Sequence, residues 1–445
     1  MKDNKARLIH GSVGKTLIRM TIPMTFGLLG IVAFNLVDLF FVGKLGTKEL
    51  AALSFTFPVV MIIGSFALGI GVGTSAVISR AIGTGNHNRV KTLAAHSLIL
   101  STLLGFVFVA VGVLTIDPVF RLLGATSSML PLIRQYMLIW YSGVIFIIIP
   151  MVGNSAIRAT GEMKIPSILM LIAVGINIIL DPLLIYGIGP FPELGLKGAA
   201  IATVISRFIA LISALYFLIY RYDMISFVSS SRKRILVSWR AILYLGIPTA
   251  GTRIIVPLAM GIITRLIASY GPEAVAGFGV STRIEFFALS VVFALATVIG
   301  PFVGQNWGAK QKSRIMRGIG FSKRFSIGWG IFMLVFLAVF ARPVAAIFNN
   351  SPVVISTVVL YLRIVPVGYG LFGVLIIAAS TLTVLRKPVL ATGLMLLQMV
   401  VLYVPLAFLG SRFFGLAGIF AALVTAYLIA GVLSNFVLAG ALREI

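Results

Sequence analysis

The chain has 445 residues, of which 60% are hydrophobic and only 11% are charged, and its formal net charge is +25. A soluble domain of this size needs far more charge to cover its surface, so this composition excludes a soluble globular protein. The chain contains no cysteine, which excludes a disulfide, a thiol nucleophile and a thiolate metal site.

Apolar stretches recur along the whole chain, and each reaches the roughly 20 residues that a helix needs to cross a bilayer. We therefore predict an all-α polytopic membrane protein with twelve transmembrane helices. No part of the sequence alternates apolar and polar residues as the strands of a membrane barrel do. The predicted spans are 17–43, 52–82, 92–116, 132–157, 165–188, 197–221, 239–268, 275–303, 317–341, 354–384, 389–410 and 415–440.

Lysine and arginine residues outside the spans concentrate at both termini and in the loops that follow every second span. The positive-inside rule therefore predicts that both termini face the cytoplasm. This spread also accounts for the net charge without a nucleic-acid partner, because no separate basic domain exists. The basic segment 222–238 is predicted to link an N-lobe, residues 1–221 with helices 1–6, to a C-lobe, residues 239–445 with helices 7–12.

The two predicted lobes resemble each other in sequence. Motifs of the first half return in the same order after 220 to 225 residues: Ile22-Pro23 as Ile247-Pro248, Gly46 as Gly271, Tyr136 as Tyr361, Pro166 as Pro388 and Gly195-Leu196 as Gly415-Leu416. Order and steady spacing indicate an internal repeat. Because each half has six spans, both halves enter the membrane with the same polarity, which predicts a parallel repeat around a central cleft for substrate.

Two carboxylates lie deep inside apolar helices of the first half, Asp38 in span 1 and Asp181 in span 5. A carboxylate within the membrane costs about 2.5 kcal/mol or more, so such residues are usually functional. Asn35 and Asn177 lie three and four residues earlier, on the same helix face as their carboxylates. An amide can bond either protonation state. This pattern predicts a proton or cation site, and the alternative is a static polar cluster that joins helices.

The second half has one embedded acid, Glu285, together with Arg253, Arg283 and Arg363. We expect an internal ion pair between Glu285 and Arg253 or Arg363, which is a structural role. No enzyme constellation occurs, because the three histidines have no nucleophile or second metal ligand at suitable spacing. We therefore expect neither a catalytic site nor a bound metal or cofactor.

Span 1 is the predicted moving part. Pro23, Gly27 and Gly30 weaken its hydrogen-bond ladder below Asp38, so bending there should cost little. The alternative is ordinary membrane-helix composition, in which glycine and proline are frequent.

With these features in place, the chain resembles the multidrug and toxic compound extrusion (MATE) family, particularly its DinF-like branch. The resemblance rests on IPMTFGLLGIVAFNLVDLFFVGKLG, NIILDPLLIYG, GLKGAAIATVIS and VGQNWGAKQKSRI, and it covers nearly the whole chain. It implies two six-helix bundles and an ion site at Asp38, Asn177 and Asp181. The neighbours that it implies in the substrate cavity are Tyr136, Asn154, Thr203 and Phe34, the last of which is a tyrosine in some relatives. Tyr136 and Asn154, 18 residues or five helical turns apart, are expected to share one helix face.

The resemblance implies a monomeric antiporter in the inner membrane of a bacterium or archaeon, which exports small organic, often cationic compounds in exchange for protons. Two alternatives remain open at this point. The exporter could be coupled to Na⁺, or the chain could flip a lipid-linked precursor, whose pyrophosphate would need the arginines of spans 7, 8 and 10.

Overall fold

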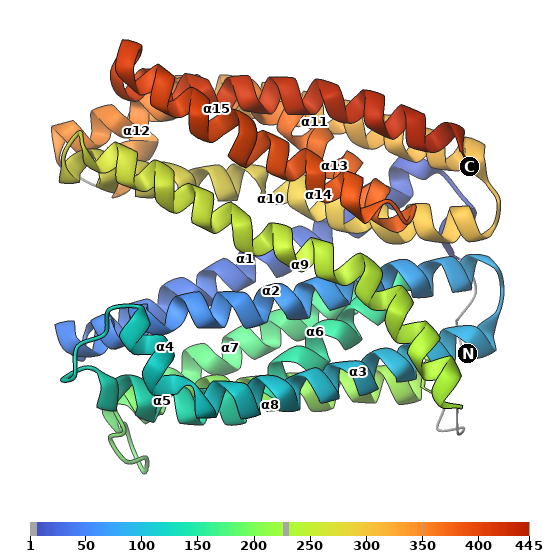
Figure 1. Cartoon of the computed structure of the whole chain (residues 1–445), viewed down its shortest axis with the longest axis horizontal. Helices are drawn as coiled ribbons and strands as arrows, with labels where there is room; N and C mark the ends of the chain where they lie inside the picture. The colour runs from blue at the N-terminus through green and yellow to red at the C-terminus, as the bar shows by residue number, and fades with distance from the viewer. Residues whose placement is uncertain (1–6, 226–230, 349, 445) are drawn as a thin grey trace. The chain divides into compact units, whose positions relative to one another are not determined.

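The computed structural model describes residues 7–225, 231–348 and 350–444, and the side chains of Asn35, Leu36, Leu39 and Thr47 lie outside this description. Every regular element in the described part is helical (Figure 1). The α-helices are α1 Val13–Gly43, α2 Thr47–Gly83, α3 His87–Leu114, α4 Ile116–Leu122, α5 Leu130–Ser142, α6 Val144–Ala159, α7 Lys164–Tyr186, α8 Leu196–Tyr216, α9 Arg232–Ala268, α10 Pro272–Gly308, α11 Lys312–Phe348, α12 Pro352–Ile364, α13 Tyr369–Val384, α14 Pro388–Leu396 and α15 Val404–Arg443.

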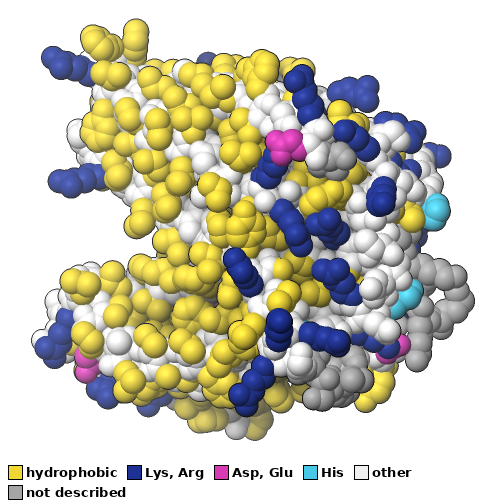
Figure 2. Space-filling view, turned by 45° about the vertical axis from the view of Figure 1, so that its right-hand side comes forward, with side chains coloured by type: hydrophobic (Ala, Val, Ile, Leu, Met, Phe, Trp, Pro, Cys, Tyr) yellow, Lys and Arg dark blue, Asp and Glu magenta, His cyan; other side chains and the backbone are white. Residues whose placement is uncertain are grey.

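The described residues contain ten helical segments that are long and apolar enough to cross a membrane, and eleven when α5 and α6 count as one bent span. The last of these segments, Pro388–Arg443, is 56 residues long and breaks at Gly415, so it accounts for two predicted spans. The twelve predicted spans are therefore all present. Figure 2 shows broad hydrophobic surface, with many lysine and arginine side chains gathered in a band beside it, as helices embedded in lipid require.

The chain forms two compact units. Unit 1 contains residues 26–250, and unit 2 contains residues 8–25 and 251–445. This division differs from the predicted lobes at two places. The first turns of α9 belong to unit 1 because Ile242 packs in its core, where Gly73 approaches the Ile242 carbonyl closely. Residues 8–25, which include the first part of α1, belong to unit 2, and Arg314 binds the stretch just before that helix.

This anchoring of the N-terminal segment uses the VGQNWGAKQKSRI motif. Arg314 donates hydrogen bonds to the carbonyls of Leu8, Gly11 and His10 at 3.0, 2.7 and 2.6 Å. The Leu8 N–H in turn donates to Gln305 Oε1 at 3.1 Å. The motif thus holds the chain just before α1 on the ends of α10 and α11.

The backbone confirms the internal repeat. Gly195 precedes α8 with φ 55° and ψ −131°, and its predicted counterpart Gly415 has φ 60° and ψ −140°. Positive φ at both positions requires glycine. Three residues later, Gly198 and Gly418 each lie against a carbonyl of the preceding helix, so a Cβ there would come within 2.3 Å and 1.9 Å of that oxygen. The same tight helix–helix crossing therefore occurs once in each unit.

Candidate functional site

The candidate site of unit 1 begins with α7. Asn177 and Asp181 lie one turn apart on this helix, and both side chains are fully buried. Asn177 Nδ2 donates a hydrogen bond to Asp181 Oδ1 at 3.1 Å, as the four-residue spacing predicts. Among the described residues, neither Asp181 Oδ2 nor Asn177 Oδ1 has a hydrogen-bond partner. Pro182 interrupts the helix ladder directly after the carboxylate.

Asp38 lies on α1, which packs against α7 at two levels. Gly27 meets Ser167, where an added Cβ would lie 3.1 Å from the serine hydroxyl. Beyond Asp38, the Tyr186 hydroxyl donates to the Phe41 carbonyl at 2.7 Å. These contacts hold Asp38 close enough to Asp181 for the two carboxylate charges to repel each other. Asp38 is half-buried, and its buried Oδ1 has no hydrogen-bond partner within the described part of the chain.

The predicted cavity residues come from three further helices and α1. All four are buried, with 4 to 8% of their surface exposed: Tyr136 of α5, Asn154 of α6, Thr203 of α8 and Phe34 of α1. The charges of both aspartates act on the Tyr136 hydroxyl, which places that group in the same site. Asn154 Oδ1 has no hydrogen-bond partner among the described residues.

One geometric expectation about these residues was wrong. Tyr136 and Asn154 do not lie five turns apart on one helix, because the span breaks at Gly143 into α5 and α6, which are bent by 45°. Gly143 sits against Val204 of α8, where a Cβ would come within 2.5 Å of a methyl group. Any shared orientation of the two side chains therefore comes from the bend rather than from helical periodicity.

The remaining predicted site residues lie along α1. Pro23, Gly27 and Gly30 all fall within this helix, which is assigned as one element from Val13 to Gly43. The boundary between the two units crosses it after Thr25, two residues beyond Pro23. The predicted bending stays a prediction. The predicted contribution of Asn35 lies outside the described side chains.

Arg207 is a site residue that the sequence reasoning missed. It lies on α8, one turn after Thr203, and its guanidinium stacks over the Phe34 ring with 5.1 Å to the ring centroid. Its Nε is buried and has no hydrogen-bond partner among the described residues. The sequence does contain a signal for it: Arg207 lies inside an apolar span, four residues after the predicted site residue Thr203, and therefore on the same helix face. Unit 1 therefore holds a cation that packs on Phe34, one turn before Asp38 on α1.

The expected ion pair of Glu285 is not formed. Among the described residues Glu285 contacts neither Arg253 nor Arg363 as an ion pair, and it accepts hydrogen bonds from two tyrosine hydroxyls instead. Arg253 and Arg363 are exposed, as long basic side chains can be when their head groups reach polar surroundings. No cluster of three or more metal-ligating side chains occurs in the described part of the chain.

Comparison with known proteins identifies the family. The MatE family model matches residues 23–183 and 248–409, two copies that follow the internal repeat. The chain is 39% identical to an FAD transporter of Shewanella oneidensis over 97% of this chain and 95% of the relative. It is 28% identical to the multidrug export protein MepA of Staphylococcus aureus, over 96% and 94% of the two chains.

Solved structures agree with this assignment. A mutant of the Vibrio cholerae MATE transporter VcmN superposes with a TM-score of 0.93 at 31% identity, over 97% of this chain and 98% of that one. A bent form of the same transporter superposes with a TM-score of 0.92 over 97% of each chain. The chain therefore belongs to the MatE family, and it is a multi-pass membrane transporter rather than an enzyme.

Proposed function

We propose that this protein exports small organic compounds across the inner membrane of a bacterium or archaeon in exchange for protons, with both termini in the cytoplasm. The observation that carries the proposal is the carboxyl pair of unit 1. Asp181 is fully buried, is bonded on one oxygen by Asn177, and feels the charge of Asp38. No lysine or arginine forms an ion pair with either aspartate among the described residues.

Two like charges in a buried site are costly, and binding one proton removes the repulsion. Substrate bound nearby would compete with that proton through the same carboxylates. Protonation from the outside would then favour release of the substrate to the outside. The N-lobe aspartates thus couple the two movements in this proposal.

Sodium is the alternative coupling ion. Three oxygen atoms of the site have no hydrogen-bond partner among the described residues, and such atoms are possible ligands for a cation. Asp38 Oδ1, Asp181 Oδ2 and Asn177 Oδ1 are three oxygen atoms that could ligate a cation. We favour the proton because Asn177 already directs its N–H donor at Asp181, and a donor proton beside a cation repels it. A Na⁺ site also needs more oxygen ligands than these.

The test uses inside-out vesicles in which a pH gradient and a Na⁺ gradient are imposed separately. We expect accumulation of substrate with an acidic interior alone, and little with Na⁺ alone. Asp38→Asn and Asp181→Asn should insert normally and lose accumulation. Asp117→Asn is the matched control, because Asp117 pairs with Arg134 on an exposed surface at 3.1 Å. Accumulation driven by Na⁺ alone would replace the proton in this proposal.

The substrate class has two candidates. The resemblance to multidrug exporters favours organic cations, which the carboxylates would attract. Arg207 stacked on Phe34 favours a second candidate, an aromatic anion such as a flavin nucleotide. A guanidinium with an unused donor binds phosphate, and an aromatic ring stacks on a flavin. The relative that is 39% identical carries the name FAD transporter, which supports the same choice.

The two classes are separated by offering the vesicles a cationic dye, FAD and FMN in parallel. For a flavin exporter we expect saturable FAD uptake that falls at least about tenfold in Arg207→Gln, since a charged hydrogen bond contributes about 1.5–3 kcal/mol. Arg158→Gln is an informative comparison, because Arg158 already donates to Ser155 at 2.5 Å. Uptake of the dye alone, unaffected by Arg207→Gln, would favour the organic cations. Flipping of a lipid-linked pyrophosphate in the same membranes would contradict both.

A further inference from the structure

Unit 2 contains a second carboxyl cluster, centred on Glu285 of α10. The Tyr361 hydroxyl of α12 donates a hydrogen bond to Glu285 Oε2 at 2.5 Å, and the Tyr427 hydroxyl of α15 donates to Oε1 at 3.1 Å. Each carboxylate oxygen therefore has its own phenol donor. This arrangement stabilises a charged carboxylate without a basic partner.

Two more tyrosines complete the cluster. Tyr369 at the start of α13 and Tyr403 of the π-helical turn Leu397–Tyr403 are both fully buried. Their hydroxyl groups have no hydrogen-bond partner among the described residues. The charge of Glu285 acts on both hydroxyls, so they lie within electrostatic reach of its carboxyl. Buried hydroxyls without a protein partner are uncommon.

The four tyrosines suit a carboxyl that changes its protonation state. When Glu285 is ionised, Tyr361 and Tyr427 donate to its two oxygens. When it is protonated, the new O–H needs an acceptor, and the unused hydroxyls of Tyr369 and Tyr403 can accept as well as donate. The cluster therefore contains partners for both states, whereas a purely structural carboxylate would need only the donors.

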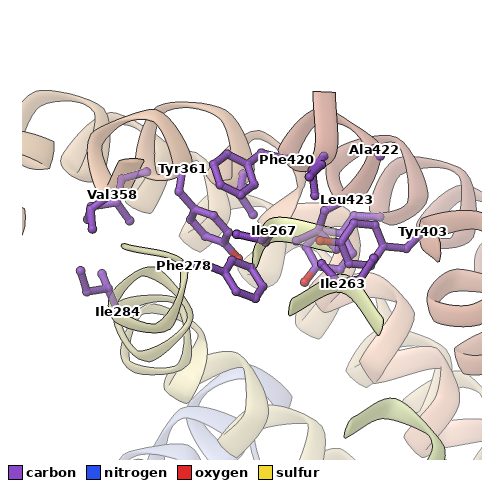
Figure 3. Packing of buried hydrophobic residues seen from close by; sticks show 14 of the residues in the cluster. Ile263, Ile267, Phe278, Ile284, Val358, Tyr361, Tyr403, Phe420, Ala422 and Leu423 are labelled. Carbon is purple, nitrogen blue, oxygen red and sulfur yellow. The ribbon is translucent and has the colours of Figure 1, made fainter. Parts of the chain in front are cut away.

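The surroundings leave a proton as the ligand that fits. The rings of Phe278 and Phe420 lie 6.1 and 4.9 Å from the Tyr361 ring, and Phe372 stacks on Tyr427 at 4.2 Å. Figure 3 shows this packing around Tyr361. These rings pack against the two phenols that bind the carboxylate oxygens. A metal ion would face the hydroxyl protons that already point at both carboxylate oxygens.

The groups that face Glu285 from the neighbouring helices are phenols rather than charges. These phenols come from four elements: Tyr361 from α12, Tyr369 from α13, Tyr403 from the turn before α15, and Tyr427 from α15 itself. From α11, the Trp329 indole donates to the Ala288 carbonyl, one turn along α10, and does not titrate. No described lysine, arginine or second carboxylate pairs with Glu285.

This cluster is not a copy of the unit 1 site. At the repeat spacing of 225 residues Asp38 corresponds to Ile263, and at 222 residues Asp181 corresponds to Tyr403. Ile263 and Tyr403 both lie in the hydrophobic core drawn in Figure 3. Tyr136 and Tyr361, however, are repeat partners, and each lies beside a carboxyl. Unit 2 thus has neither aspartate at the corresponding repeat positions, and its carboxyl lies on a different helix.

We propose that Glu285 and its four tyrosines form a second proton-binding site of this transporter, located in unit 2. Glu285 is half-buried, and its four phenol partners are buried. A role for this proton in transport rests on the proton-coupled export proposed above. The binding of the proton itself does not.

The test measures proton binding directly and needs no transport. The purified full chain in lipid nanodiscs is titrated from about pH 5 to about pH 9, which brackets a carboxyl stabilised in either form. The infrared carbonyl band of protonated carboxyl groups is recorded at each step. We expect Glu285→Gln to lose one titrating component that Asp38→Asn retains. A spectrum of Glu285→Gln that matches the parent throughout would overturn the proposal.

Conservative tyrosine variants keep the proposal testable if Glu285→Gln does not fold. Tyr361→Phe removes a donor to the ionised form, so the midpoint of the Glu285 band should move to higher pH by about one unit. The double change Tyr369→Phe and Tyr403→Phe removes the acceptors of the protonated form and should move the midpoint to lower pH. Shifts in the same direction, or none, would overturn the proposal even if export proved to be proton-coupled.

Discussion

Asn177→Leu tests how the amide of α7 sets the coupling site. Leucine branches at the same side-chain atom but cannot donate to Asp181 Oδ1, which now accepts from Asn177 Nδ2 at 3.1 Å. Both residues are fully buried, so water does not replace the lost donor. The variant should fold, because the change buries no new polar group, although the larger leucine needs some repacking and Asp181 loses one partner.

The size of the effect follows from the hydrogen bond that is lost. A bond to a charged group contributes about 1.5–3 kcal/mol, and a bond to a neutral group contributes about 0.5–1.5 kcal/mol. Asn177 can bond either state of Asp181, so its net preference for the ionised state is the difference, about 1–1.5 kcal/mol. One pH unit corresponds to about 1.4 kcal/mol. Removing Asn177 should therefore keep the proton on Asp181 to a pH about one unit higher.

The assay is the rate of export from proteoliposomes as a function of the pH on the outer face. We expect the midpoint of this profile to move to higher pH by about one unit in Asn177→Leu. Asn435→Leu is the matched control, because Asn435 only donates to the Gly431 carbonyl of its own helix. An unchanged midpoint, or one that moves to lower pH, would refute the idea that this amide stabilises the ionised aspartate.

Two further predictions concern the packing that supports the site. Gly73→Ala should lower the free energy of unfolding by about 1–3 kcal/mol, because its Cβ would lie 2.4 Å from the Ile242 carbonyl oxygen. Gly64→Ala on the same helix is the control: its Cβ meets nothing within 4 Å, so the change should be neutral or stabilising by up to about 1 kcal/mol. Arg314→Ala removes three hydrogen bonds and should cost about 3 kcal/mol or more, against little change for exposed Arg317→Ala. Thermal unfolding in detergent checks both, and equal melting temperatures within either pair would contradict the packing described here.

Much of the fold could be predicted because membrane solvation acts on every residue of a span. The twelve spans follow from apolar runs, and the order of the repeat follows from matched motifs such as Gly195 and Gly415, which the structure shows with the same positive φ. The Asn177–Asp181 bond also follows, since four residues make one helical turn. Each of these features depends on the composition or spacing of residues along the chain.

Contacts between helices were harder to predict. The break at Gly143 depends on how closely Val204 of another helix approaches, which spacing along the chain does not reveal. Glu285 was expected to pair with an arginine because opposite charges attract, yet tyrosines from distant parts of the sequence surround it. Arg207 escaped notice for a related reason, since its partner is an aromatic ring on α1 rather than a carboxylate.

The central claim is that Asp38 and Asp181 exchange protons for substrate. The most direct measurement imposes a substrate gradient on proteoliposomes without a pH or Na⁺ gradient and records the internal pH. The account predicts substrate-driven proton movement in the parent chain and in Asp117→Asn, and none in Asp38→Asn or Asp181→Asn. Proton movement at the parental rate in either of the last two variants, or substrate movement without any change of internal pH in the parent chain, would contradict it.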